Sequence, residues 1–188
     1  MIQTIATCTV AITLAEMGDK TQLLALTLAA RFRAPKTVLA GIFIATVINH
    51  LLSAWLGAAV AGWLGPNLVR WIVGLGFLAF AAWTLVPDSE PEGAMEAQYG
   101  SPLMTTIVLF FLAEMGDKTQ LATVALAAKL DSIVAVTIGT TAGMMIADGL
   151  AVVLGDRLGA SFNPTLLRRV AAALFLVLGV VTLVVPIG

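Results

Sequence analysis

The chain has 188 residues, of which 60% are hydrophobic and 11% are charged, with a mean hydropathy of +1.01 and a net charge of −1. A soluble domain carries roughly 25% charged residues, so the composition excludes an ordinary soluble protein and predicts a single integral membrane bundle. No basic patch with interleaved aromatic residues occurs, which excludes nucleic acid as a partner. The single cysteine, Cys8, excludes an intrachain disulfide and a cluster of thiolate ligands.

Six apolar stretches are long enough to cross a bilayer, which takes about 20 residues in a helix. Turn signals separate them, including a basic segment with proline after the first stretch and Asn-Pro before the sixth. An acidic linker without Lys or Arg, residues 88–101, joins the third stretch to the fourth. The predicted transmembrane helices cover 3–30, 36–63, 68–87, 102–129, 133–158 and 165–186.

A ten-residue string occurs twice. Leu14–Leu23 reads LAEMGDKTQL, and the same letters return 98 positions later at Leu112–Leu121. The chain therefore divides into two halves, 1–87 and 102–188, with three spans each. Because three is odd, the second half enters the membrane from the opposite side, as in the inverted repeats of many secondary transporters. The predicted fold is an all-α integral membrane protein with six transmembrane helices arranged as two inverted three-helix repeats.

Each copy of the string places charged side chains in an apolar segment, where they are costly and indicate a functional site. On an uninterrupted helix, residues three and four apart share a face, so Glu16, Asp19 and Lys20 are expected to point one way. A two-fold axis in the membrane plane would bring both copies to one cavity. Carboxylate and amide oxygens suit Mg²⁺, Ca²⁺ and Mn²⁺. The expected metal ligands are Glu16, Asp19, Gln22, Glu114, Asp117 and Gln120.

The charges of the two copies sum to −2 when all groups are ionised. One divalent cation or two protons would neutralise that sum, which is the minimal logic of a cation/proton antiporter. Lys20 and Lys118 are interpreted mainly as structural counter-ions. Gly18 and Gly116 fit two interpretations equally: a helix break that frees carbonyls for the ion, or close helix packing.

His50 in the second span and Asp148 in the fifth span occupy equivalent positions of the repeat, because they are also 98 residues apart. Both are ionisable groups in apolar runs. They are interpreted either as a proton path or support around the cation site, or as polar contacts between helices worth about 1 kcal/mol. The residues expected to support the site are Lys20, Thr21, Lys118, Thr119, Asn49, His50 and Asp148.

The two Glu-Met-Gly-Asp-Lys-Thr strings resemble the Glu-x-Gly-Asp-Lys-Thr/Ser membrane family, which includes the transmembrane-protein-165 proteins of the Golgi and bacterial MneA/Mnx-type manganese exporters. The resemblance covers essentially the whole chain through the motif spacing, the acidic loop and the three-plus-three plan. It implies Mn²⁺ and Ca²⁺ transport in exchange for protons. It also implies that the motif acids are Glu16, Asp19, Glu114 and Asp117, and that Lys20, Thr21, Gln22, Lys118, Thr119 and Gln120 complete the motifs.

The predicted function is a secondary transporter that exports a divalent cation, with Mn²⁺ preferred, in exchange for protons by alternating access. No cofactor is expected beyond the transported ion. The alternatives are a Ca²⁺/H⁺ antiporter with the same site, a passive divalent-cation channel and an intramembrane enzyme. The symmetry of the motifs argues against an enzyme, because a catalytic acid and base need different environments.

The basic residues of the short loops predict the orientation. With the N-terminus outside, the inner loops hold six Lys or Arg residues and the outer side holds two. Cytoplasmic loops are enriched in Lys and Arg, so both termini are expected outside and the acidic linker in the cytoplasm. The short chain resembles the bacterial members, which predicts the inner (plasma) membrane.

Overall fold

A computed structural model describes residues 1–86, 99–130, 132–158 and 164–185. Most of the predicted acidic linker, together with the end of the sixth predicted span, lies outside these residues. The described residues form α-helices and contain no β-strand. The helices are α1 (Ile2–Glu16), α2 (Lys20–Phe32), α3 (Pro35–Trp63), α4 (Pro66–Thr84), α5 (Pro102–Glu114), α6 (Lys118–Leu130), α7 (Ile133–Leu158) and α8 (Pro164–Val184).

Three segments of the described chain are helices long and apolar enough to cross a membrane: Pro35–Trp63, Pro66–Thr84 and Ile133–Val153. They correspond to the second, third and fifth predicted spans. The predicted spans over 3–30 and 102–129 are not continuous helices. Each of these segments is divided into two shorter helices, α1 with α2 and α5 with α6.

The two halves begin their helices at equivalent positions. Lys20 and Lys118, which are 98 positions apart, begin α2 and α6.

Prolines stand at the first position of α3, α4, α5 and α8. Proline suits this position because its fixed φ matches the helix and the first N–H needs no intrahelical partner.

Two glycines of α7 allow α1 to approach closely. Thr9 donates from Oγ1 to the carbonyl of Gly139 at 3.0 Å, and Thr13 donates to the carbonyl of Gly143 at 3.2 Å. A Cβ added to Gly143 would lie 2.7 Å from the Thr9 carbonyl oxygen. The pairing shows that α1 and α7 run in the same direction. The Gly-x-x-x-Gly spacing of Gly139 and Gly143 often marks close packing of membrane helices and is a sequence signal for this contact.

Replacing Gly143 by valine is expected to destabilise the protein by about 1 to 3 kcal/mol, because added methyl groups in a tight contact force the backbones apart. The measurement is the midpoint of thermal unfolding in detergent. Gly149→Ala on the same helix is the matched control, since the nearest atom to its added Cβ is Leu39 Cδ2 at 4.0 Å. Equal midpoints for both variants would contradict the close approach of α1 and α7.

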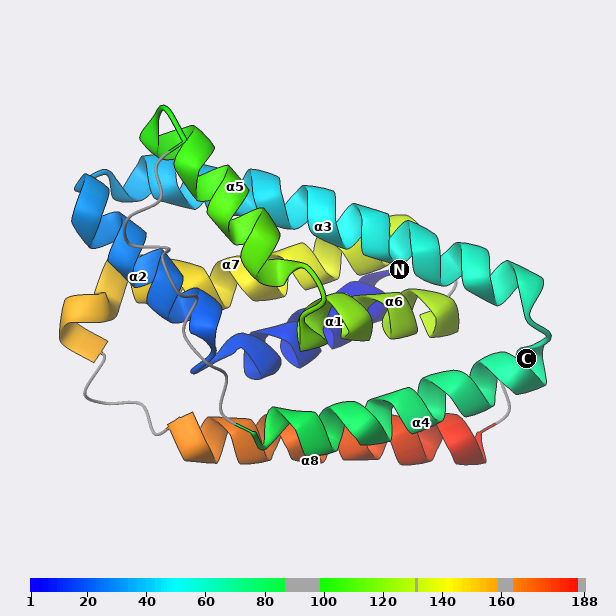
Figure 1. The fold of residues 1–188 in the computed structure, drawn as a ribbon. Helices are drawn as coiled ribbons and strands as arrows, with labels where there is room; N and C mark the ends of the chain where they lie inside the picture. Colours follow the sequence, from blue (N-terminus) through cyan, green and yellow to red (C-terminus); the bar gives the residue numbers. More distant parts are fainter. Residues whose placement is uncertain (87–98, 131, 159–163, 186–188) are drawn as a thin grey trace.

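Helices α4 and α8 form a pair along one side of the bundle (Figure 1). The rings of Phe77 and Phe175 stack with centroids 6.1 Å apart, and Phe80 meets both rings edge-on. The pair packs against α1 and α6. It therefore covers the site-bearing helices from one side.

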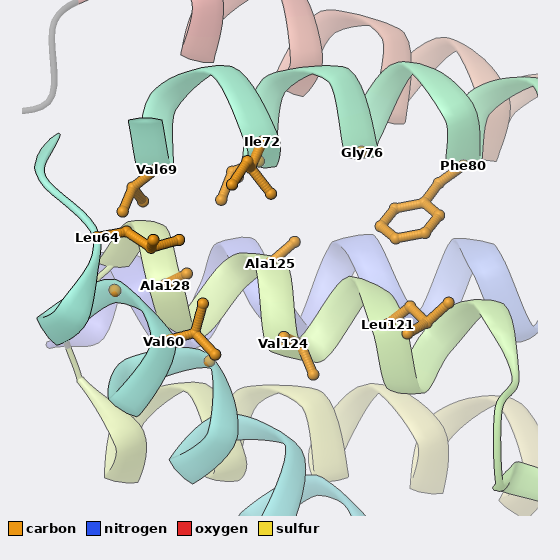
Figure 2. Close-up of a pocket in the computed structure, with 13 residues that line it drawn as sticks. Val60, Leu64, Val69, Ile72, Gly76, Phe80, Leu121, Val124, Ala125 and Ala128 are labelled. Carbon is orange, nitrogen blue, oxygen red and sulfur yellow. The ribbon is translucent and has the colours of Figure 1, made fainter. Parts of the chain in front are cut away.

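A cavity of about 200 Å³ lies between α3, α4 and α6 (Figure 2). The side chains that line it are all apolar and include those of Val60, Ile72, Phe80 and Leu121. Such a lining offers no oxygen ligands, so this cavity is not the cation site.

Candidate metal centre

The two motifs form breaks between helices. α1 ends at Glu16 and α2 begins at Lys20, and the same break recurs between α5 and α6. Gly18 and Gly116 lie at the centres of the breaks with φ of 85° and 76°. A residue with a Cβ pays roughly 1 to 2 kcal/mol for this left-handed conformation, which explains the glycines. Of the two interpretations of these glycines, the structure therefore shows the helix break.

The break changes which side chains can meet. The argument that Glu16, Asp19 and Lys20 share one helical face was wrong, because the helix ends between them. Asp19 instead caps α2, where its Oδ1 accepts a hydrogen bond from the Lys20 backbone N–H at 2.8 Å. The side chains are thus positioned by the turn and by contacts with the other half.

The two motifs converge through crossed ion pairs. Lys20 Nζ lies 2.7 Å from Asp117 Oδ1, and Lys118 Nζ lies 3.2 Å from Asp19 Oδ1. Each lysine therefore pairs with the aspartate of the opposite motif. The two pairs differ in exposure, since the side chain of Lys20 is 20% exposed and that of Lys118 is 2% exposed.

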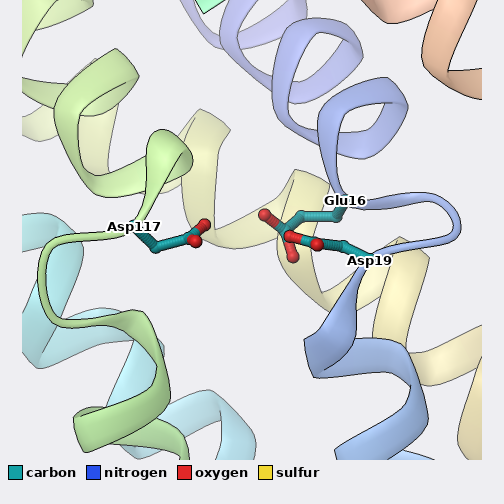
Figure 3. Close-up of side chains that lie close together, drawn as sticks. All are labelled: Glu16, Asp19 and Asp117. Carbon is teal, nitrogen blue, oxygen red and sulfur yellow. The ribbon is translucent and has the colours of Figure 1, made fainter. Parts of the chain in front are cut away.

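Three carboxylates gather at the centre of this arrangement. Oxygens of Glu16, Asp19 and Asp117 lie within 4.8 Å of one another, and all three residues are buried. Figure 3 shows Asp117 pointing across the site toward Glu16 and Asp19. This is a hard-oxygen donor set of the kind that suits Mg²⁺, Ca²⁺ or Mn²⁺.

The two motif glutamates are held in matching ways. Thr21 Oγ1 donates to Glu16 Oε2 at 2.6 Å, and Thr119 Oγ1 donates to Glu114 Oε2 at 3.0 Å. Within the described part of the chain, the other oxygen of each glutamate, Oε1, is buried and accepts no hydrogen bond. Each glutamate thus keeps one oxygen available for a cation or a proton.

The glutamines of the motifs close the two breaks. The Oε1 atoms of Gln22 and Gln120 accept the backbone N–H of Gly18 and Gly116 at 2.8 and 2.7 Å. Their Nε2 groups donate to the neighbouring long helices, at the Ala147 carbonyl for Gln22. These two predicted ligands therefore bind the backbone of the breaks and the neighbouring helices α3 and α7. The Ala147 carbonyl could not be recognised as an acceptor from the sequence, because every residue carries such a backbone group.

Asn49, His50 and Asp148 lie on the two long helices that flank the breaks. Asn49 accepts from Gln120 at 3.1 Å and donates to the Phe111 carbonyl at 3.2 Å, which ties α3 to α5 and α6. His50 and Asp148 are fully buried. Hydrogen bonds thus connect Asn49 to the second motif, whereas His50 and Asp148 stay predictions as site residues.

Comparisons with known proteins identify the family of the chain. A family model described as "Divalent cation/proton antiporter GDT1" matches residues 4–92 and 102–186. The chain belongs to the GDT1 family. Members of this family are transporters rather than enzymes, and the family match confirms the resemblance stated above.

Several GDT1-related proteins resemble the chain along most of its length. A Vibrio cholerae protein named "Putative manganese exporter" is 44% identical over 173 residues, covering 91% of this chain and 86% of that protein. GDT1-like protein 5 of Arabidopsis thaliana is 30% identical, with 93% and 92% of the two chains covered. GDT1-like protein 4 of Oryza sativa is 32% identical, with 88% and 67% covered. No solved structure matches.

Proposed function

We propose that this GDT1-family protein exports Mn²⁺ across the plasma membrane in exchange for protons, and that the motif carboxylates bind the ion. The observation that carries the proposal is the buried group of Glu16, Asp19 and Asp117, assembled from both halves. The Vibrio cholerae relative named as a manganese exporter favours Mn²⁺ over Ca²⁺ as the cargo.

The charges of the site support an exchange of one divalent cation for two protons. The crossed ion pairs balance the two aspartates with the two lysines. Glu16 and Glu114 then remain as the two motif carboxylates without a lysine partner. Because an unbalanced buried charge is costly in a membrane, the glutamates hold either a divalent cation or two protons.

We further propose that the bundle has six spans in two inverted repeats, with α1–α2 and α5–α6 as the broken first and fourth spans. In that topology the first and fifth spans run in one direction, and so do the second and fourth. The parallel pairing of α1 with α7 supports this. Discontinuous helices at the repeat interface are typical of secondary transporters.

The two halves are not packed equivalently, which supports alternating access as the transport mechanism. The α4–α8 pair packs against α1 and α6. The repeat relates α1 to α5 and α6 to α2, so a symmetric arrangement would allow the same pair to pack against α5 and α2. A second conformation with the pair on α5 and α2 would open the site to the opposite side. The proposed orientation keeps both termini outside and the 88–101 linker in the cytoplasm.

Reconstituted vesicles test the proposed function. An imposed pH gradient should drive Mn²⁺ against its concentration gradient, and Mn²⁺ movement should carry protons the other way, as read by a pH dye inside the vesicles. Mn²⁺ flux without proton movement would indicate a passive channel. Stronger inhibition of transport by Ca²⁺ than by unlabelled Mn²⁺ at equal concentrations would favour the Ca²⁺/H⁺ alternative.

A further inference from the structure

The apolar cavity between α3, α4 and α6 opens at the side of the bundle. Buried side chains such as Val73 and Ala125 form its floor, whereas Val60, Ile72 and Leu121 line it and are themselves exposed (Figure 2). Helices α3 and α4 are both long and apolar enough to cross a membrane. The cavity therefore opens between two membrane helices, toward the hydrocarbon of the bilayer.

The size and the lining of the cavity suit an apolar chain. An apolar cavity of about 150 Å³ in another protein stays dry and binds benzene, so a volume of about 200 Å³ has room for several methylene groups. Leu68 and Leu75 on α4 are exposed as well, so the cavity is continuous with the lipid-facing surface of this helix. The acyl chains of membrane lipids border that surface.

The length of the cavity matches the depth of one leaflet. Val69 and Phe80 both line it and lie eleven residues apart on α4, which at 1.5 Å per residue is about 16 Å. Half of a hydrocarbon core of roughly 30 Å is about 15 Å. The corner between α3 and α4 carries the exposed Trp63 and Trp71, and tryptophan is enriched at the membrane–water interface. The cavity therefore runs from the interfacial end of α4 into a single leaflet.

A basic side chain lies at the interfacial end of the cavity. Arg70 follows Val69 on α4, and its Cζ lies 5.8 Å from the centroid of the Trp71 ring. Within the described part of the chain, the Arg70 Nε atom is buried and has no hydrogen-bond partner. A guanidinium group matches the geometry of a phosphate, and basic pockets between membrane helices bind lipid head groups. This charge favours a phospholipid over an uncharged apolar molecule.

We propose that the cavity binds one phospholipid, with an acyl chain between α3, α4 and α6 and the phosphate at Arg70. Helix α4 belongs to the α4–α8 pair, which packs against α1 and α6. A chain in the cavity buries apolar surface of both α4 and α6, so the lipid stabilises the contact between this pair and the rest of the bundle. The inference does not depend on the proposed cation exchange, because its test measures lipid binding rather than transport.

Gly76 allows the cavity to be filled without disturbing its walls. It lines the cavity, and a Cβ added there would meet no atom within 4 Å. Gly76→Leu therefore places a side chain where the acyl chain is proposed to lie, and Gly76→Ala fills a smaller part of the same space. Gly62→Leu is the matched control, because a Cβ at Gly62 also meets no atom within 4 Å and this residue does not line the cavity.

A photoreactive lipid locates the acyl chain. The protein is placed in nanodiscs that contain phosphatidylglycerol with a diazirine in one acyl chain, and mass spectrometry identifies the labelled residues after illumination. The wild type and Gly62→Leu should carry label on the buried Val73 and Ala125. Gly76→Leu should lose this label, Gly76→Ala should carry less of it, and Arg70→Gln should also lower it. Labelling of the exposed Leu75 should be equal in all variants and reports equal access to lipid.

Thermal unfolding provides the second measurement and reports folding. Addition of phosphatidylglycerol to the protein in detergent should raise the unfolding midpoint of the wild type and of Gly62→Leu more than that of Gly76→Leu. Equal labelling of Val73 and Ala125 in the wild type and in Gly76→Leu would overturn the proposed acyl-chain site. Unchanged labelling in Arg70→Gln would overturn the phosphate contact. Cross-links between two copies of the chain at these residues, without lipid label, would assign the cavity to a dimer contact instead.

Discussion

Glu16→Gln and Asp117→Asn are each expected to reduce Mn²⁺ export to background while the protein still inserts and folds. Each change removes one anionic oxygen donor from the group of three carboxylates within 4.8 Å. Loss of a residue that merely orients a metal ligand costs 10- to 100-fold, so loss of a direct ligand should cost at least about 100-fold. The measurement is Mn²⁺ efflux from vesicles that contain equal amounts of each variant.

Met115→Leu is the matched control for these variants. Met115 belongs to the second motif, but its side chain is 58% exposed and lies outside the carboxylate group. It should transport at the wild-type rate. Normal efflux from vesicles with Glu16→Gln or Asp117→Asn would remove these acids from the cation site.

Lys118→Gln is expected to destabilise the protein more than Lys20→Gln, although the two lysines occupy equivalent motif positions. The Lys118–Asp19 pair is 2% and 1% exposed, and breaking a buried ion pair from one side costs about 3 to 5 kcal/mol. Asp117 is itself only 2% exposed, but Lys20 is 20% exposed, so in Lys20→Gln water can reach the position of the lost ammonium group and compensate part of the charge on Asp117. The thermal unfolding midpoint in detergent measures the difference.

The double variant Lys118→Gln/Asp19→Asn tests the cause of this loss. It removes both charges and keeps an asparagine that can still cap α2, so it should recover most of the stability lost in Lys118→Gln. The double variant should nevertheless fail to transport, because one carboxylate of the site is missing. Equal destabilisation by the two single lysine variants would contradict the different burial of the two ion pairs.

The repeated string was enough to predict the family. It also gave the motif acids as candidate ligands, because charged groups in apolar segments have few roles other than function. It was not enough to predict the geometry. A rule for continuous helices grouped Lys20 with Glu16 and Asp19 of its own motif, whereas the structure pairs Lys20 with Asp117 of the other one. The break at the left-handed Gly18 turns Lys20 away from its own motif and toward Asp117. The sequence did not settle that a break occurs there, because glycine in a membrane segment is equally typical of close packing.

The sequence by itself determined the membrane character, the two-fold repeat and the residue types that suit a hard cation, since these follow from composition and from identical letters at a fixed offset. Only the tertiary structure decided that the two motifs meet, that their lysines cross, and that Gln22 binds the Ala147 carbonyl on α7. The physical reason is that these facts depend on how α7 packs against α1 and how the breaks turn the chain. Such contacts join residues that are more than 90 positions apart, and local sequence preferences do not specify them.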